Sequence, residues 1–110
     1  MRRRSDYLRC YREGRRRHGA LSILYSAPNE LPHPRLGITA SRKVGHAVTR
    51  VRLKRRIREI YRRWSERSRL PAFDLVVHLK PAAASASFDE LRGELYTLLT
   101  SVTPKPRRAS

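Results

Sequence analysis

The stretch SRKVGHAVTRVRLKRRIREIYRR, residues 41–63, carries ten basic residues and a single acid, Glu59. Successive residues of an α-helix are about 100° apart, so residues three and four apart share a face. The large apolar residues of the stretch and its end fall in one arc, with Tyr61 at its edge: Leu53, Ile57, Ile60 and Trp64. The stretch therefore predicts a helix that docks on a hydrophobic core through this arc, with Trp64 as its anchor.

The basic residues of this helix form a broad stripe away from the apolar arc. The stripe consists of Arg50, Arg52, Lys54, Arg55, Arg56, Arg58, Arg62 and Arg63, with Val48 and Val51 among them. On a solvated helix, opposite charges four residues apart stabilise by about 0.2 to 0.5 kcal/mol per pair, whereas like charges repel. Because only Glu59 and Glu66 are available as acids, we interpret the stripe as a surface that binds a polyanion. An ordinary solvated outer face is the alternative.

The lead-in to the helix extends the charged surface. Gly45 permits a tight turn and a close approach of the backbone to a ligand. Arg42 and Lys43 follow the end of a predicted strand, and His46 stands at the start of the helix as a candidate phosphate contact. Strand end, turn and helix together form one continuous candidate anion-binding face.

The composition of the whole chain points the same way. Its 110 residues include 26 Lys and Arg but only 9 Asp and Glu, which gives a formal net charge of +17. Charge of this size opposes compaction and indicates a nucleic-acid partner. Arginines outnumber lysines by 22 to 4, and guanidinium groups bind phosphate through a bidentate fork. The length suits one domain, 1–110, ordered over about 5–102, with basic tails at 1–4 and 103–110.

A short first helix is expected over Asp6–Glu13. Ser5 precedes it as a candidate cap. Tyr7 and Tyr11 are four residues apart and therefore share one side of the helix. From the residues alone, this side is either part of the core or an aromatic platform.

Three later segments are predicted to be strands. Residues of alternating character indicate strands over 21–26 and 36–40. The segment between them, 28–34, contains three prolines and is interpreted as a loop between antiparallel neighbours. The nearly continuous apolar run Phe73–Leu79 predicts a central strand with both faces covered.

The remaining features predict a soluble, cytoplasmic binding protein that is not itself catalytic. Ser87 and Glu90 form a capping box that begins an amphipathic helix over Phe88–Thr100. The carboxylates and the four histidines lack the spacing of a metal site. The single cysteine, Cys10, is expected to pack inside. No apolar run is long enough for a signal-peptide core or a membrane span.

The same residues resemble a known family. RLGITASRKVGHAVTRVRLKRRIRE, residues 35–59, resembles the signature region of the protein subunit of bacterial ribonuclease P, in which a strand with paired basic residues leads into an Arg-Asn-Arg helix. RSDYLRCYREGRRRHG, residues 4–19, is similar to the N-terminal helix of the family with its two aromatics. LSILY (21–25) is similar to the next strand of the family, and FDLVVHLKPAAASASFDEL (73–91) to its C-terminal strand and helix. The resemblance spans about residues 4–100.

The resemblance implies both a fold and a function. The implied fold is α+β: a small single-domain α/β sandwich with a central, mostly antiparallel sheet and the order α-β-β-β-α-β-α. A left-handed βαβ crossover runs through the basic helix, as in the second domain of a small-subunit ribosomal protein. The implied function is the non-catalytic protein component of ribonuclease P, whose catalytic RNA uses Mg²⁺ to remove the 5′ leader of precursor tRNA. The expected partners are these two RNAs, without DNA or membrane, and no metal or cofactor is expected on the protein.

Two sets of site residues follow from the basic stripe and the resemblance. The candidate catalytic-RNA-binding set is Arg42, Lys43, His46, Arg50, Arg52, Lys54, Arg55, Arg58 and Arg62. Tyr7, Tyr11 and Tyr25 fall where the family has aromatics that line a cleft for the single-stranded leader. Stacking of a base on such a ring is worth about 1 to 3 kcal/mol and tolerates any sequence. One position departs from the family pattern, because Val51 replaces the asparagine and can neither donate nor accept a hydrogen bond.

Other classes of protein are alternatives to this assignment. A small basic ribosomal protein, or another structural RNA-binding protein, would have a similar length and composition. A metal-dependent nuclease would need clustered carboxylates, and the DNA-binding class would need a helix-turn-helix spacing; the sequence has neither. A membrane-surface helix would need a free apolar face, whereas this helix commits that face to the core.

Overall fold

The computed structural model describes residues 3–103 of the chain. Its helices and strands follow in this order: α1 (Arg4–Glu13), β1 (Arg15–His18), β2 (Ser22–Pro28), β3 (Arg35–Ala40), α2 (Ala47–Arg63), β4 (Phe73–Leu79) and α3 (Phe88–Val102). The predicted α+β class and the order α-β-β-β-α-β-α are therefore confirmed. Of the predicted tails, residues 1–2 and 104–110 lie outside the described residues, while Arg4 is already part of α1.

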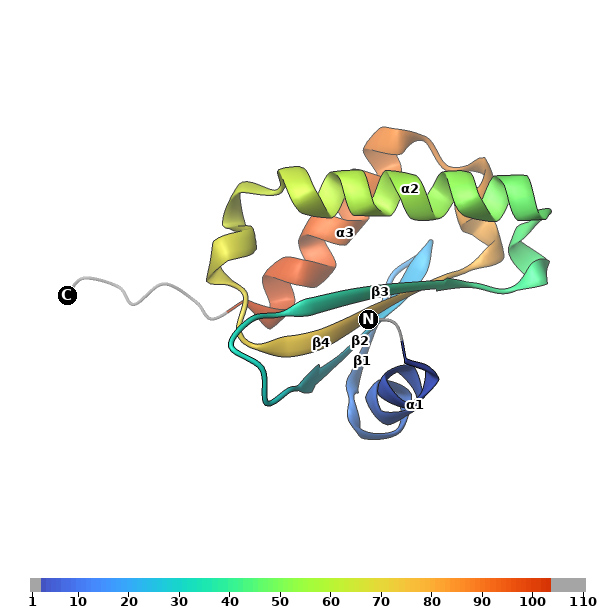
Figure 1. Ribbon diagram of the computed structural model, residues 1–110. Helices are drawn as coiled ribbons and strands as arrows, with labels where there is room; N and C mark the ends of the chain where they lie inside the picture. Colours follow the sequence, from blue (N-terminus) through green and yellow to red (C-terminus); the bar gives the residue numbers. More distant parts are fainter. Residues whose placement is uncertain (1–2, 104–110) are drawn as a thin grey trace.

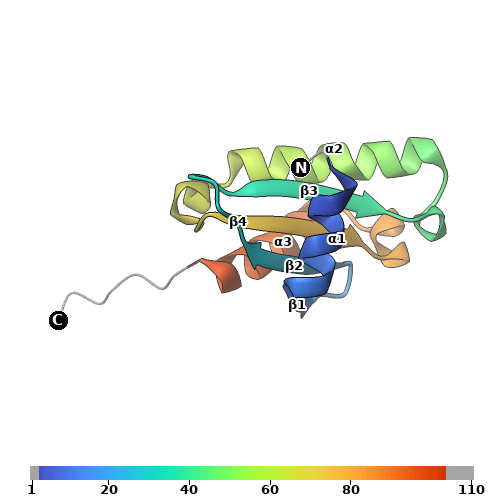
Figure 2. The ribbon, with the colours of Figure 1, turned by 60° about the horizontal axis from the view of Figure 1, so that its bottom comes forward.

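The strands form one mixed sheet with the order β1-β2-β4-β3. The pairs β1–β2 and β2–β4 are antiparallel, and the pair β3–β4 is parallel. Helix α2 connects the two parallel strands (Figure 1). Viewed from the α2 side with β3 pointing upward, β4 lies to the left of β3 (Figures 1 and 2). The crossover is thus left-handed, which the resemblance predicts and which runs against the right-handed rule that holds in about 98% of cases.

The sheet order corrects one prediction. Residues 28–34 form a connection between β2 and β3, but these strands are not neighbours, because β4 lies between them. Strand β2 also continues to Pro28, beyond the predicted alternation that ends at Ser26, since it pairs with β4 as far as Phe73. Because β4 pairs along both of its edges, it separates β2 from β3 in the sheet. The same pairing extends β2 to Pro28.

Two layers of helix cover the two faces of the sheet. Helices α2 and α3 cover one face, and α1 packs across the other (Figure 2). The main core lies under α2 and α3, and β4 contributes Leu75, Val77 and Leu79 to it. A smaller cluster lies under α1 and includes Cys10 together with Val76 of β4. Strand β4 is thus central and covered on both faces, as its apolar run predicts.

The helix ends test two predicted caps. The capping box of α3 is present: Glu90 N donates to Ser87 Oγ at 3.1 Å, and Ser87 N donates to Glu90 Oε1 at 3.0 Å. The predicted cap at Ser5 is wrong. Helix α1 begins earlier, because Asp6 N already donates to the carbonyl of Arg3 at 3.0 Å and places Ser5 inside the first turn.

Candidate nucleic-acid interface

The basic helix α2 docks on the sheet as its apolar spacing predicts. Leu53, Ile57 and Ile60 are fully buried in the main core. Trp64 directly follows the helix and is only 6% exposed. Its ring stacks on Tyr96 of α3 with 6.0 Å between ring centroids. These contacts fix the rotation of α2 about its own axis, and therefore fix which residues face outward.

Seven of the basic residues between the end of β3 and the middle of α2 form what we call the basic face. They are Arg42, Lys43, Arg50, Arg52, Lys54, Arg55 and Arg58, and each is exposed or half-buried. Within residues 3–103, none of the seven forms an ion pair with a carboxylate. The basic face is therefore a concentration of positive charge that the described part of the protein does not neutralise.

Arg62 differs from the other members of its predicted set. Glu59 accepts ion pairs from Arg62 and Arg63, each at 2.8 Å. The one acid of α2 thus partly compensates the charge at the C-terminal end of the helix and leaves the N-terminal part without an acidic partner. The basic residues of α2 that lack an acidic partner within residues 3–103 therefore lie nearer its N-terminal end, next to the preceding turn.

A tight turn joins the strand end to α2. Arg42–Val44 form a short 3₁₀ helix, and Gly45 follows with φ of +150°. Backbone in this region favours glycine, so the sequence-based prediction of a glycine turn is confirmed. Val44 is buried and anchors the turn, whereas Arg42 and Lys43 are exposed. His46 is the N-cap residue of α2, is exposed, and makes no capping hydrogen bond with its side chain.

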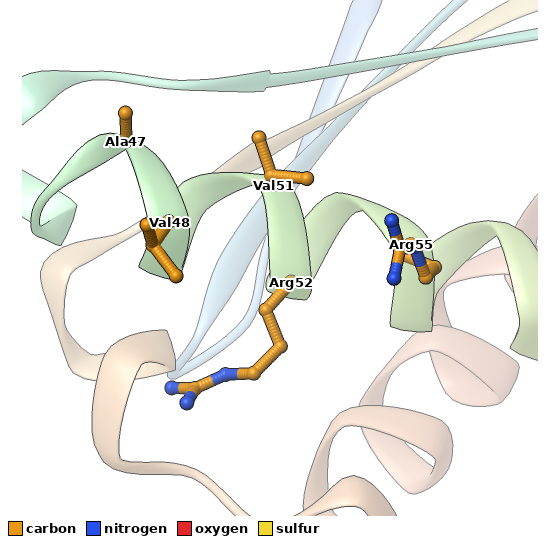
Figure 3. Close-up of a pocket in the computed structure, with 5 residues that line it drawn as sticks. All are labelled: Ala47, Val48, Val51, Arg52 and Arg55. Carbon is orange, nitrogen blue, oxygen red and sulfur yellow. The ribbon is translucent and has the colours of Figure 1, made fainter.

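The outer side of α2 has an apolar patch among its arginines. Val48 is 80% exposed and Val51 is 54% exposed. A shallow hollow of about 360 Å³ is lined by Ala47, Val48, Val51, Arg52 and Arg55. Figure 3 shows Ala47 and Val51 pointing to one side of the helix and Arg52 to the other. Val51 therefore faces outward on the basic surface and has no place in the hydrophobic core.

The three predicted leader-binding tyrosines gather on the opposite face of the sheet; we call them the tyrosine cluster. Tyr11 of α1 and Tyr25 of β2 are in edge-to-face contact, with 4.6 Å between ring centroids and 86° between ring planes. Tyr7 packs over Gly37 of β3 so closely that a Cβ at residue 37 would lie 2.6 Å from its ring. All three rings are half-buried around the small cluster that includes Cys10. They are part of the packing and are still accessible.

A buried carboxylate, Asp74, holds α1 against the sheet. It is 0% exposed. Arg35 forms a fork with it, from Nε to Oδ1 at 2.8 Å and from Nη2 to Oδ2 at 2.7 Å. Arg9 of α1 donates to Oδ2 at 2.9 Å, and Asn29 donates to Oδ1 at 3.0 Å. We call these four side chains the Asp74 network.

The Asp74 network was missed by sequence reasoning, although one signal was available. Burial alone would raise the pKa of Asp74, but hydrogen bonds from Arg35, Asn29 and Arg9 outweigh it and lower the pKa to about 2. A charged residue inside the apolar run FDLVVHL needs such partners, since an unpaired buried charge is costly. The lone aspartate in that run was the signal.

The described residues hold neither a metal cluster nor a reactive thiol. Within residues 3–103, no group of three or more His, Cys, Asp or Glu side chains could hold a metal ion. Cys10 is fully buried, as predicted, and burial raises the pKa of its thiol to about 11. In the same part of the chain, no helix is long and apolar enough to cross a membrane.

The fold and the site together define a class: a small α+β protein with a left-handed crossover helix, a basic face on one side of its sheet and a tyrosine cluster on the other. Residues 1–103 match the family model described as Ribonuclease P. The ribonuclease P protein component of Thermobifida fusca is 41% identical over 120 residues, which span 100% of this chain and 79% of that protein. The chain belongs to the ribonuclease P protein family.

Further relatives and solved structures agree with this family. The ribonuclease P protein component of Syntrophus aciditrophicus is 36% identical over 100 residues, which span 91% of this chain and 83% of that protein. The structure of the Staphylococcus aureus RNase P protein matches with a TM-score of 0.85 and 29% identity, over 94% of this chain and 96% of that one. The Thermotoga maritima RNase P protein matches with a TM-score of 0.83 and 31% identity, over 94% and 97%.

Proposed function

We propose that this chain is the non-catalytic protein component of a cytoplasmic ribonuclease P, in which a catalytic RNA cleaves the 5′ leader from precursor tRNA. Family membership links the chain to an endoribonuclease complex. The observation that carries the proposal is the basic face, where seven cations have no carboxylate partner within residues 3–103. Charge of this kind is stabilised by the phosphates of a nucleic acid.

In this proposal, the basic face binds the catalytic RNA. Engaging about 6 to 10 phosphates would make the affinity fall by roughly 10³ to 10⁵ between low and moderate salt. His46, exposed at the start of α2, would add a contact that donates to phosphate. Mg²⁺ would be held by the RNA and would support the cleavage there.

The tyrosine cluster would bind the single-stranded leader. Its half-buried rings combine a fixed position with an accessible surface, and each base that stacks on such a ring gains about 1 to 3 kcal/mol. Stacking reads no particular sequence, which suits leaders that vary between tRNAs. The two surfaces lie on opposite sides of the sheet (Figure 2), so one RNA contact would not block the other.

A reconstituted cleavage assay tests the proposal. Purified protein is added to the cognate catalytic RNA and precursor tRNA at low Mg²⁺. Under this condition few metal ions neutralise the RNA phosphates, so the RNA depends on the positive charge of its protein. The expected result is a clear rise in cleavage rate with protein, and tighter binding of precursor tRNA than of mature tRNA. A protein that binds RNA without raising cleavage would instead be a structural RNA-binding protein. Cleavage by the protein alone would contradict its non-catalytic role.

Replacing Val51 with asparagine tests the departure from the family pattern. Because Val51 faces outward and is 54% exposed, Val51→Asn should leave processing of precursor tRNA unchanged or improve it, since an amide adds hydrogen-bonding groups on the basic surface. Cleavage rates at low Mg²⁺ and a thermal melt measure both effects. A large loss in rate with an unchanged melting temperature would show that an apolar contact of Val51 with RNA matters.

A further inference from the structure

Strand β1 places three consecutive arginines, Arg15, Arg16 and Arg17, at one edge of the sheet. The basic face begins at the end of β3, the strand at the other edge. Within residues 3–103, none of the three arginines forms an ion pair with a carboxylate. The β1 edge is therefore a second concentration of positive charge, separate from the basic face, and the proposed function does not yet use it.

The pairing of β1 with β2 sends these arginines to different faces of the sheet. Residues directly opposite each other in an antiparallel pair project their side chains on the same face. Arg16 is opposite Tyr25, which belongs to the tyrosine cluster. Arg17 is opposite Leu24, which lies in the main core under α2 and α3, and Arg15 shares the face of Arg17. Arg16 is thus the arginine of β1 that lies on the tyrosine side.

A row of residues across the sheet connects the tyrosine cluster to Arg16. Tyr25 of β2 is opposite Val76 of β4, and Val76 is opposite Gly37 of β3, which the Tyr7 ring covers. Helix α1 crosses the same face from the β3 side toward β1 (Figure 2). The Cβ atoms of a cross-strand pair lie about 5 Å apart, so the guanidinium of Arg16 is within reach of a group bound at the Tyr25 ring.

Arg16 also differs from other arginines on the tyrosine side because its charge is available to a ligand. Arg9 and Arg35 lie on this side too, but both donate to the buried carboxylate of Asp74, at 2.9 and 2.7 Å. Arg16 is exposed and has no carboxylate partner within residues 3–103. Proteins that bind single strands combine rings for the bases with positive groups that follow the phosphates. The tyrosine cluster supplies the rings, and Arg16 supplies a positive group beside them.

We propose that Arg16 binds the 5′ leader of precursor tRNA by holding the phosphate next to the base that stacks on Tyr25. This inference rests on the proposed function, because it extends the same leader-binding surface from the tyrosine cluster to the edge of the sheet. The ligand is a phosphodiester of single-stranded RNA, and the contact does not distinguish one base from another. Arg16 therefore contributes affinity for any leader long enough to reach β1. Mature tRNA has lost its leader and gains nothing from Arg16.

The test compares precursor and mature tRNA in the complex of the full chain with its catalytic RNA. Single-turnover cleavage over a range of complex concentrations gives the apparent affinity for the precursor, and competition by unlabelled mature tRNA gives the affinity for the mature form. Arg16→Ala should weaken precursor binding by roughly 3- to 10-fold, the effect of one hydrogen bond at an accessible surface, and leave mature tRNA unaffected. The slope of log precursor affinity against log salt should fall by about 0.7, the value for one phosphate of a single strand.

The neighbouring arginine provides a matched control. Arg15 is on the same strand, is exposed like Arg16 and has no carboxylate partner in the described part of the chain, but it faces the α3 side of the sheet. Arg15→Ala therefore removes the same charge and should leave the preference for precursor over mature tRNA intact. A thermal melt checks that both variants remain folded, which is expected because both side chains are exposed.

The possible outcomes separate this inference from the proposed function. Equal losses in Arg16→Ala and Arg15→Ala would overturn the inference, because net charge alone would then explain them. A loss in Arg16→Ala that is equal for precursor and mature tRNA would also overturn it, since the contact would then lie outside the leader. A preference for the precursor that survives in Arg16→Ala removes only the role of Arg16. If the unsubstituted complex showed no such preference, leader binding by the protein would itself fail.

Discussion

Replacing Asp74 with alanine is expected to lower the free energy of unfolding by about 3 kcal/mol. Removing one partner of a buried ion pair typically costs about 3 to 5 kcal/mol, because the remaining charge stays uncompensated. Here Arg35 and Arg9 keep 26% and 33% of their side-chain surface in solvent, so the lower end of the range applies. Chemical denaturation in sulfate buffer measures the change.

A matched control separates burial from charge. Glu66→Ala removes another carboxylate, which pairs with Arg69 at 2.9 Å but is 46% exposed. Surface pairs of this kind are worth about 0 to 1 kcal/mol. A loss in Asp74→Ala no larger than in Glu66→Ala would show that the Asp74 network does not stabilise the protein.

The same network predicts how stability depends on acid. The folded protein lowers the pKa of Asp74 from its ordinary 3.8 to about 2, so the unfolded chain binds the proton more readily. The contribution is present in full above about pH 4 and is lost as the pH falls toward 2; it amounts to about 2 kcal/mol. In Asp74→Asn this segment of the stability curve should be flatter. An unchanged curve between pH 4 and 2 would contradict the assignment.

Removing two cations of the basic face, in Arg52→Ala/Arg55→Ala, is expected to weaken binding of the catalytic RNA by roughly 30- to 100-fold at moderate salt. Each arginine is exposed on the outer side of α2 without an acidic partner within residues 3–103, and each contact with a phosphate is a charge-assisted hydrogen bond. The slope of log affinity against log salt should fall by about one for each lost phosphate contact. Filter binding across a salt series gives both quantities.

The same helix offers a control with equal loss of charge. Arg62→Ala/Arg63→Ala also removes two arginines, but both of them already form ion pairs with Glu59. The expected loss of RNA affinity is well below that of Arg52→Ala/Arg55→Ala. Arginines that are already paired with a carboxylate neutralise RNA phosphates less, and therefore release fewer counterions from the RNA. Equal losses in the two double variants would show that net charge alone, and not its position on α2, determines binding.

Local sequence patterns were sufficient for the elements with strong periodicity. The apolar arc of α2, the capping box of α3 and the buried run of β4 were all predicted from the residues, because each depends on neighbours within one or two turns or strands. Strand β1, with the sequence Arg-Arg-Arg-His, was not recognised as a strand. It has no apolar alternation and exists because its backbone pairs with β2.

Features built from distant residues could not be predicted in this way. The partners of Asp74 lie 39, 45 and 65 residues away along the chain, and no local pattern specifies them. The left-handed crossover and the gathering of the tyrosines followed from the resemblance to a family and not from periodicity. The pairing of Glu59 with Arg62 and Arg63 was visible as a spacing of three and four residues, and it would have separated Arg62 from the basic face.

The central position of β4 has a consequence for synthesis of the protein. Strands β2 and β3 pair with β4 and not with each other. When the chain leaves the ribosome from its N-terminus, each of these strands therefore has an unpaired edge until Leu79 has emerged. At about 5 to 20 residues per second, the interval between Ala40 and Leu79 lasts roughly 2 to 8 s. During that time the edges of β2 and β3 that β4 will fill are available for pairing with other chains, and completion of β4 closes these two edges at once.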